Sequence, residues 1–462
     1  MNNSFSEEQL RALTDHLPVL PTRHFLLLQG LMGPFFERIG EALRRDGYEV
    51  FKVNFNGGDR WFWNLPGAIN YRDTVENWPD ALRHIILQHG ITDVLLFGDC
   101  RPMHSVALDV CRNLHIPVHV FEEGYLRPDW VTLELGGVNG HSSLPRDPDY
   151  YVKTAGYLPP APEHHAVPSS FRRRALEGIA YNTADILTRW YFSNWTNHRP
   201  WHPIVEGIGW TKRLARRKAA QRRTRRLCRK LEMGALPYFL FPLQLDADAQ
   251  VRLHSDFSGI EDAIDRVVVS FAKFAPKTAR LVIKEHPLDN GVKDWRAIVR
   301  RKAQECGVGP RVGYMEAGDI ALVVGNAAGV VTINSTTGTL AVAQNIPTIT
   351  LGRAVYDLAG ITHQGPLDEF WHHPTAPDRE VFAAFRRVLI ERCLIPGGFF
   401  SDEALDTLVK AATKRLEQHS PIAFAAASKA RQHQRFSDTF HRAQNPLDRA
   451  TASIAHAVAP TL

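Results

Sequence analysis

The chain has 462 residues, of which 44% are hydrophobic and 23% are charged, and these values are typical of a globular protein. The length favours two or three domains over a single core. No apolar run approaches the roughly 18–20 residues needed to span a bilayer, and residues 1–8 lack the basic region and apolar stretch of a secretory signal. We therefore expect a cytoplasmic protein, or one that lies against a membrane from the cytoplasmic side.

The first part of the chain alternates short apolar segments with helical ones. A turn follows each apolar segment, and this repeated order predicts a parallel sheet with helices on both faces. The predicted strands are residues 24–30, 48–53, 93–99 and 117–121, and the first predicted helix is residues 35–45.

The middle of the chain breaks this pattern. Prolines mark a loop, and an apolar helix is predicted over Ala175–Trp195. Between Thr211 and Lys230, eleven residues are Lys or Arg and none is Asp or Glu. Because Pro and Gly are absent, we predict a helix there, called the basic arm (Lys212–Lys230). Its expected partner is an anionic membrane leaflet or nucleic acid, with a solvated linker as the alternative. The lack of aromatic residues that stack on bases disfavours nucleic acid.

A second series of apolar segments predicts a second Rossmann-like half. Its expected strands are residues 238–242, 281–283, 320–324, 329–333 and 348–351. We expect an N-terminal extension (1–20), an N-terminal Rossmann-like domain (21–160), a helical and basic linker (161–232), a C-terminal Rossmann-like domain (233–385), and C-terminal helices with a tail (386–462).

The five cysteines lack CxxC spacing, which argues against a zinc site and a disulfide framework.

An acidic turn, Glu122-Glu123-Gly124, follows the predicted strand 117–121. Carboxylates at this end of a strand face the cleft in which open α/β sheets bind ligands, and one of them can act as a general acid or base. Adjacent residues of an extended chain point in opposite directions, so one of the two faces the cleft, and we favour Glu123. The alternative is a solvated turn in which Arg127 is a salt-bridge partner.

Polar residues also follow the predicted strand 93–99. In a parallel sheet, Asp99, Arg101 and His104 lie at the same edge as Glu123. The Arg101 guanidinium is suited to bind a substrate carboxylate or phosphate through two hydrogen bonds. A turn aspartate that caps the next helix explains Asp99 equally well.

The first strand of the second half ends in Gln244-Leu245-Asp246-Ala247-Asp248. Asp246 and Asp248 share a face if the chain is extended, which places a carboxylate across the cleft from Glu123. Glycosyl transfer with retention by double displacement needs a nucleophilic carboxylate and a second group that handles protons. Helix N-cap acids, or Mg²⁺ ligands with D-x-D spacing, are the alternatives.

Two further motifs end strands of the second half. They are Lys284-Glu285-His286-Pro287 and Asn334-Ser335-Thr336-Thr337-Gly338. Pro287 restricts the chain just past the imidazole, so His286 stays at the strand end, where it can bond a phosphate or ribose. Ser335 and Thr336 offer hydroxyls beside free N–H groups of a helix N-terminus, a site suited to a phosphate. Together the motifs predict an enzyme that takes a sugar from a nucleotide with the help of a carboxylate.

These motifs resemble bacterial capsule polysaccharide proteins of the KpsS/LipB type, which are related to the KpsC type. The resemblance covers about residues 20–415 and is most specific over 97–146. The segments that carry it are Gly98–Pro102, Phe121–Pro128, Gly137–Asn139, Ser142–Arg146, Pro242–Gln244, Lys284–Pro287, Asn334–Gly338 and Pro396–Gly398.

The resemblance implies a GT-B-like architecture, in which two Rossmann-like domains face a cleft. It also implies a retaining β-Kdo transferase that takes Kdo from CMP-β-Kdo and builds a poly-Kdo linker on a phosphatidylglycerol-type lipid. By position, Glu123 is the acid or base, and Asp248, or else Asp246, is the nucleophile. The implied donor contacts are Gln244, Lys284, His286, Pro287, Ser335 and Thr336. The implied contacts to the acceptor or the sugar carboxylate are Asp99, Arg101, His104, Glu122 and Arg127.

Under this hypothesis the basic arm docks the protein peripherally on the anionic inner membrane, where the lipid acceptor lies. No cofactor, metal or nucleic acid is expected, apart from the Mg²⁺ alternative noted for the D-x-D spacing. The rival hypothesis is a non-catalytic capsule assembly or export factor at the inner membrane. In that case the cleft is vestigial and the basic arm recruits other capsule biosynthesis and export proteins.

Overall fold

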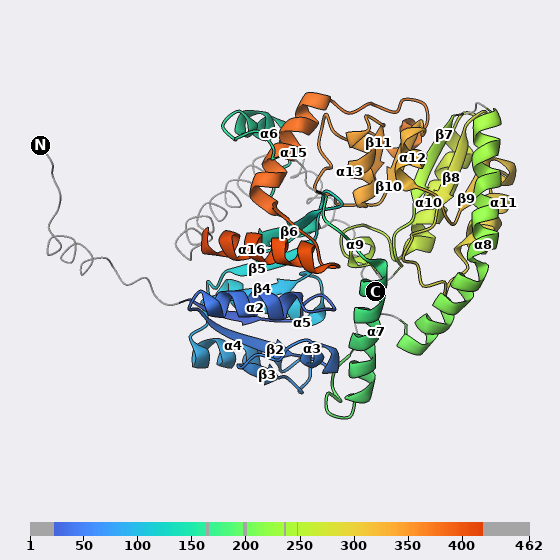
Figure 1. Ribbon diagram of the computed structural model, residues 1–462. Coiled ribbons are helices and arrows are strands. Elements are labelled where there is room, and N and C mark those ends of the chain that lie inside the picture. Colours follow the sequence, from blue (N-terminus) through green and yellow to red (C-terminus); the bar gives the residue numbers. More distant parts are fainter. Residues whose placement is uncertain (1–22, 163–165, 197–200, 235–236, 247, 419–462) are drawn as a thin grey trace, which may run out of the picture.

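The computed structural model describes residues 23–162, 166–196, 201–234, 237–246 and 248–418 (Figure 1). The predicted N-terminal extension and most of the predicted tail lie outside these residues. The described chain forms two α/β units, each built around its own sheet. This arrangement confirms the GT-B-like fold class predicted from the sequence, with two Rossmann-like domains.

The N-terminal domain is built on a seven-stranded sheet in the order β12-β6-β5-β4-β1-β2-β3. Its strands are β1 (His24–Leu27), β2 (Glu49–Asn54), β3 (Ala68–Asn70), β4 (Asp93–Phe97), β5 (Val118–Glu123), β6 (Trp130–Leu135) and β12 (Leu394–Pro396). The strands from β5 to β3 pair in parallel, as predicted, whereas β6 runs antiparallel to β5 and β12 runs antiparallel to β6. The parallel order brings the loops after β4 and β5 to the same edge.

Helices cover both faces of this sheet (Figure 1). They are α2 (Phe35–Arg45), α3 (Gly57–Trp61), α4 (Trp78–His89), α5 (Pro102–Asn113) and α16 (Asp402–Gln418). The apolar face of α2 packs on the sheet together with that of α16, so the end of the described chain returns to the N-terminal domain. The short 3-10 helix η1 (Asn139–His141) and α6 (Pro148–Ala155) follow β6.

The C-terminal domain has a five-stranded parallel sheet in the order β11-β10-β7-β8-β9. Its strands are β7 (Tyr238–Pro242), β8 (Arg280–Lys284), β9 (Val312–Met315), β10 (Gly329–Thr332) and β11 (Thr348–Thr350). Its helices are α9 (Ala249–Arg252), α10 (Ile260–Phe274), α11 (Trp295–Glu305), η2 (Gly309–Arg311), α12 (Ile320–Gly325), α13 (Thr336–Ala343) and α14 (Leu367–Phe370). The following helix, α15 (Arg379–Cys393), packs against α6, β6 and β12 of the N-terminal domain. Buried aromatic rings such as Phe239, Phe271 and Trp371 fill its core.

One predicted strand is wrong, because residues 320–324 form helix α12. Asp319 caps this helix, and its carboxylate accepts a hydrogen bond of 2.8 Å from the N–H of Ala321. A short apolar run fits a buried strand and a buried helix equally well, so its periodicity alone does not distinguish them. The cap decides in favour of the helix.

The connecting segment is shared between the two domains. Helix α7 (Phe171–Leu187) lies against α3 of the N-terminal domain, and the long helix α8 (Pro203–Gly234) lies along β9 of the C-terminal domain (Figure 1). A Cβ atom at Gly58 would lie 2.6 Å from the Tyr181 ring, so the close contact of α3 with α7 requires glycine there. Within the described ranges, none of the helices combines the length and apolarity needed to traverse a bilayer.

Candidate functional site

Glu123, at the end of β5, carries two arginine partners. Its carboxylate lies 2.7 Å from the Arg127 guanidinium and 3.2 Å from that of Arg174, which comes from α7. Burial alone would raise the pKa of Glu123, but the charges of Arg127 and Arg174 hold it below its ordinary value. Glu123 is therefore ionised at neutral pH. Arg127 was expected as a salt-bridge partner under the alternative of a solvated turn, whereas no motif in the sequence points to Arg174.

The neighbouring Glu122 has the opposite electrostatic character. One carboxylate oxygen accepts a hydrogen bond of 2.9 Å from the N–H of Glu123. Burial, together with the negative charges of Glu123 and Asp248, raises the pKa of Glu122 to about 7, although Arg101 opposes this rise. Two adjacent carboxyl groups thus differ in protonation near neutral pH, a pattern that separates proton-transfer roles in enzymes.

The residues after β4 do not all face the acidic turn. Arg101 donates a hydrogen bond of 2.9 Å to the Gly30 carbonyl, and its charge acts on Glu122. His104 is fully buried, and its Nδ1–H donates to the Gly98 carbonyl over 2.6 Å. Asp99 is also buried, and its carboxylate bonds inward rather than toward the acidic turn. Of these three residues after β4, Arg101 is one whose charge acts on the predicted carboxylate pair.

The structure distinguishes the two aspartates after β7. Asp246 accepts a hydrogen bond of 3.2 Å from the Ile260 N–H at the start of α10, and its other oxygen lies 2.7 Å from the Lys293 ammonium. Both of its carboxylate oxygens therefore have partners within the C-terminal domain. The Lys293 ammonium thus neutralises the charge of Asp246.

Asp248 faces the acidic turn of the opposite domain. Its Oδ1 accepts a hydrogen bond of 2.9 Å from the Gln250 N–H. Burial raises the pKa of Asp248, as does the negative charge of Glu123, whereas Arg127 lowers it. Asp248 therefore lies within electrostatic range of Glu123 and Arg127, across the domain boundary.

The side chain of Asn334 holds the loop that carries Asp248. Gln244 donates a hydrogen bond of 2.9 Å to the Asn334 side-chain oxygen, and its own oxygen accepts one of 3.2 Å from the Asn334 N–H. The Asn334 amide nitrogen also donates to the Gln250 carbonyl over 2.7 Å. Gln244 therefore positions the loop. Asn334 belonged to a motif quoted from the sequence, but its role depends on a contact between two strand ends.

His286 is a neutral hydrogen-bond donor. Its Nδ1 accepts a hydrogen bond of 3.1 Å from the Leu288 N–H, so the proton of the neutral ring resides on Nε2. Burial lowers the pKa of His286 to about 4, and Arg127 contributes to this shift. Arg213 of the basic arm holds the loop, because its guanidinium donates to the His286 carbonyl over 3.0 Å and lies 3.1 Å from Glu285.

Ser335 begins α13 as its N-cap. Its hydroxyl accepts a hydrogen bond of 3.2 Å from the Thr337 N–H, so Ser335 organises the helix N-terminus and one N–H of that turn is already taken. Thr336 lines a small hollow between the domains together with Tyr125 and Asn139. Lys284, at the end of β8, is buried, and this burial lowers its pKa. The edge of the C-terminal sheet thus presents a neutral imidazole and a helix N-terminus.

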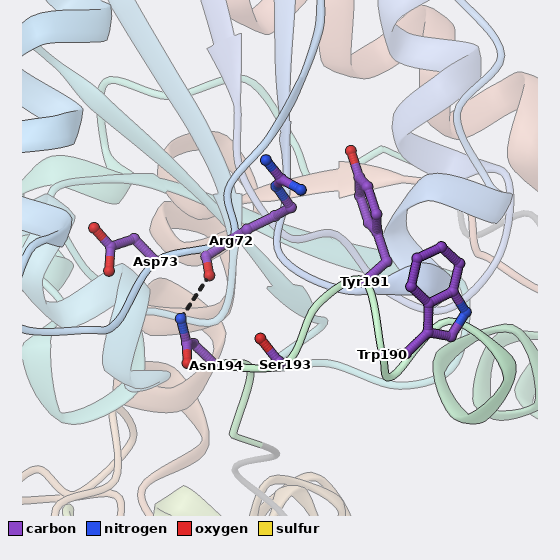
Figure 2. Close-up of a pocket in the computed structure, with 6 residues that line it drawn as sticks. All are labelled: Arg72, Asp73, Trp190, Tyr191, Ser193 and Asn194. Carbon is purple, nitrogen blue, oxygen red and sulfur yellow. Dashed lines mark hydrogen bonds between the residues drawn. The ribbon is translucent and has the colours of Figure 1, made fainter.

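A second hollow lies on the surface near the end of α7 (Figure 2). It has a volume of about 470 Å³ and is lined by Arg72, Asp73, Trp190, Tyr191, Ser193 and Asn194. Asn194 donates a hydrogen bond of 2.9 Å to the Arg72 carbonyl, and the Arg72 guanidinium lies 4.8 Å from the centre of the Tyr191 ring. Trp190 is 80% exposed at its rim, an uncommon position for so large an apolar side chain.

Comparison with known proteins gives consistent matches over most of the chain. A family model described as capsule polysaccharide biosynthesis protein matches residues 92–400. The capsule polysaccharide export protein KpsS of Escherichia coli is 36% identical over 390 residues, which cover 83% of this chain and 98% of that protein. The capsule polysaccharide modification protein LipB of Neisseria meningitidis is 35% identical over 388 residues, which cover 82% of this chain and 92% of that protein. The solved structure of Thermosulfurimonas dismutans KpsC, described as a beta Kdo 2,7 transferase, is 14% identical, covers 78% of this chain and 89% of its own, and has a TM-score of 0.36.

The separate surroundings of the two aspartates lead to a stability prediction. Asp246→Asn should lower the free energy of unfolding by about 1–2 kcal/mol, because a helix-end hydrogen bond and the pairing with Lys293 are both weakened. Asp248→Asn should leave this free energy unchanged or raise it, because it removes repulsion from Glu122 and Glu123. Urea midpoints of both variants, with exposed Asp256→Asn as the control, test this assignment. Equal losses in the two aspartate variants would contradict it.

Proposed function

The chain belongs to the capsule polysaccharide biosynthesis protein family, and we propose that it is a glycosyltransferase that moves Kdo from CMP-β-Kdo to a phosphatidylglycerol-type lipid with retention of configuration. This reaction would initiate the poly-Kdo linker of a capsular polysaccharide. The observation that carries the proposal is the meeting of Asp248 with the Glu122 and Glu123 pair across the domain boundary. A double displacement needs one such group as nucleophile and another for proton transfer.

Asp248 is the proposed nucleophile. In the first step its carboxylate attacks the anomeric carbon of Kdo, the bond to the phosphate oxygen breaks, and CMP leaves with the electron pair. In the second step the acceptor hydroxyl attacks the same carbon, releases the aspartate, and gives its proton to a base. Two inversions restore the original configuration. Asp246 does not suit the first step, because Lys293 and the Ile260 N–H occupy its carboxylate.

Glu122 is the proposed proton acceptor for the second step. A carboxyl group with a pKa of about 7 exchanges protons readily at neutral pH, which suits a general acid or base. Glu123, which the resemblance implied for this role, is kept ionised by Arg127 and Arg174. Its proposed part is to keep the pKa of Glu122 high and to hold Arg127 beside the cleft. Glu123 as the base remains the alternative.

The donor phosphate is proposed to bind at the edge of the C-terminal sheet. His286 can donate from Nε2 without carrying a positive charge, and the N-terminus of α13 at Ser335 and Thr336 favours an anion. Gln244, Lys284 and Pro287 complete the donor set predicted from the sequence. Gln244 acts there through Asn334, as a support of the loop.

The connecting helices are proposed to dock on the anionic inner membrane. Nine of the eleven basic residues of the basic arm are exposed, and only Arg213 and Arg223 are turned toward the C-terminal domain. Exposed apolar side chains lie on α7, on the start of α8 and at the hollow of Figure 2. They include Phe171, Leu176, Ile179, Leu187, Trp190, Ile204 and Ile208. Exposed apolar groups next to clustered positive charge are typical of a helix that lies in a membrane interface.

The enzymatic proposal predicts CMP release from CMP-β-Kdo in the presence of a phosphatidylglycerol acceptor. Glu122→Gln should reduce turnover by about 10²–10⁴-fold while leaving calorimetric CMP binding intact. The rate of the unmodified enzyme should rise as the pH passes about 7, where Glu122 ionises to the basic form, and this step should vanish in the variant.

The outcomes of that assay separate the alternatives. If Glu123→Gln loses turnover while Glu122→Gln keeps it, Glu123 is the proton-transfer group. If the unmodified protein binds CMP-β-Kdo but releases no CMP with any lipid acceptor, the non-catalytic assembly or export factor is the better description.

Membrane docking is tested by removing exposed charges of the basic arm. The quadruple change of Arg222, Arg225, Arg226 and Arg229 to Ser should weaken binding to phosphatidylglycerol vesicles by on the order of 10²–10³-fold, because each basic residue near the surface contributes about 1 kcal/mol. Arg223 is left unchanged because it forms an ion pair of 2.6 Å with Glu316.

A matched control changes four exposed basic residues outside the arm, Lys273, Lys277, Arg296 and Arg300, to Ser. Both variants should retain CMP binding. Co-sedimentation that weakens equally in the two variants would show a general effect of net charge and would contradict docking through the basic arm.

A further inference from the structure

Four side chains with metal-binding atoms converge at the junction of the two domains. Asp99 and Cys100 follow β4, His141 ends η1, and His254 follows α9 in the C-terminal domain. One ligand atom from each residue lies within 4.8 Å of all the others. This set is separate from the proposed carboxylates, although Glu122 and Asp248 are close enough to act on the pKa of Cys100.

The individual contacts are hydrogen-bond distances, slightly shorter than the spacing of the ligand atoms around a zinc ion. The Cys100 sulfur lies 3.2 Å from His254 Nε2 and 3.1 Å from Asp99 Oδ1, and His141 Nδ1 lies 3.0 Å from Asp99 Oδ2. A tetrahedral zinc ion with bonds of about 2.0–2.3 Å separates its ligand atoms by roughly 3.3–3.8 Å. Small side-chain rotations would bring all four atoms to that geometry.

The surroundings of these residues suit a site rather than a chance contact. His254 is fully buried and Asp99 is 2% exposed, so two of the four ligands are withdrawn from water. The His254 ring packs closely against Gly140, where a Cβ atom would lie 2.8 Å from the ring carbon Cγ. A larger residue at position 140 would therefore displace the ring. The Val138 N–H donates to Asp99 over 3.0 Å and orients the carboxylate, as outer hydrogen bonds do for metal ligands.

We propose that Asp99, Cys100, His141 and His254 bind one zinc ion that joins the two domains. Four protein ligands fill a tetrahedral shell, which is typical of structural rather than catalytic zinc sites. The ion would hold the loop of Cys100 and Arg101 against the segment that follows Asp248. It therefore acts as a positioning element for the cleft and takes no part in the bond-breaking steps.

The ligand chemistry predicts how zinc binding depends on pH. Zinc binds the thiolate of cysteine and the neutral imidazole of histidine, so binding should release the Cys100 proton and weaken as the pH falls.

The cysteine spacing could not reveal this site. A zinc site was not expected because the cysteines lack CxxC spacing, whereas this set uses one cysteine with two histidines and an aspartate. The members come from three separate segments, and His254 belongs to the other domain. Only the closed arrangement of the domains brings them together.

The test is the metal content of the intact protein, purified without a histidine tag and dialysed against metal-free buffer. Elemental analysis should find about one zinc per chain, and Cys100→Ser and His254→Gln should each lose it. Cys306→Ser and exposed His84→Gln, the matched controls, should retain it. Substoichiometric zinc in the unmodified protein, or equal loss in the controls, would overturn the proposal.

A second measurement keeps the test valid if the ligand variants fold poorly. The unmodified protein, stripped by a chelator and reloaded with Co²⁺, should show the visible bands of tetrahedral cobalt and the near-ultraviolet band of a cobalt–thiolate bond. Zinc should raise the thermal midpoint of the stripped protein. Absence of the thiolate band, or a midpoint that zinc leaves unchanged, would contradict a site built on Cys100.

Discussion

Three carboxyl groups, Glu122, Glu123 and Asp248, approach one another where the two domains meet, and like charges in a buried place repel. The protein accommodates them in two ways. Arg127 and Arg174 keep Glu123 ionised, and the remaining repulsion is relieved because Glu122 retains its proton up to about pH 7. The division of charge among these groups is therefore a consequence of domain closure, and the proposed chemistry depends on it.

The connecting segment supplies an arginine to each side of the cleft. Arg174 of α7 pairs with Glu123 of the N-terminal domain, and Arg213 of α8 holds the loop of His286 in the C-terminal domain. The same two helices expose the apolar and basic side chains proposed to meet the membrane. If these helices moved on a lipid surface, the contacts of Arg174 and Arg213 would shift the residues on both sides of the cleft. The segment is thus part of the proposed site as well as a tether.

The sequence predicted the features that depend on local order. Alternating apolar segments indicated two Rossmann-like halves, and the ends of their strands indicated where polar groups would gather. The structure confirms the two halves, and it places the loops after β4 and β5 at one edge of a parallel sheet. The error over α12 arose because a short apolar run carries no period that separates strand from helix. The antiparallel strands β6 and β12 were also not predicted. Their pairing depends on which part of the chain comes back to the edge of the sheet, and the local sequence does not indicate this.

The sequence alone could not predict the roles of residues whose partners lie far away in the chain. Asp246 and Asp248 look equivalent in sequence, yet Lys293 and the start of α10 engage only Asp246. His104 follows the same strand as Arg101, but it is buried against the Gly98 carbonyl. Similarly, the choice between Glu122 and Glu123 rests on two arginines, one of which belongs to another helix. Each distinction is a matter of burial and charge, which only the folded chain defines.

The central claim is that transfer passes through Asp248 and retains the configuration of the donor. The most direct measurement is the anomeric configuration of the newly formed Kdo linkage, determined by NMR on the lipid product made from CMP-β-Kdo. The account predicts a β linkage, because two displacements at the same carbon restore the starting configuration. An α linkage would require a single displacement and would contradict the role given to Asp248.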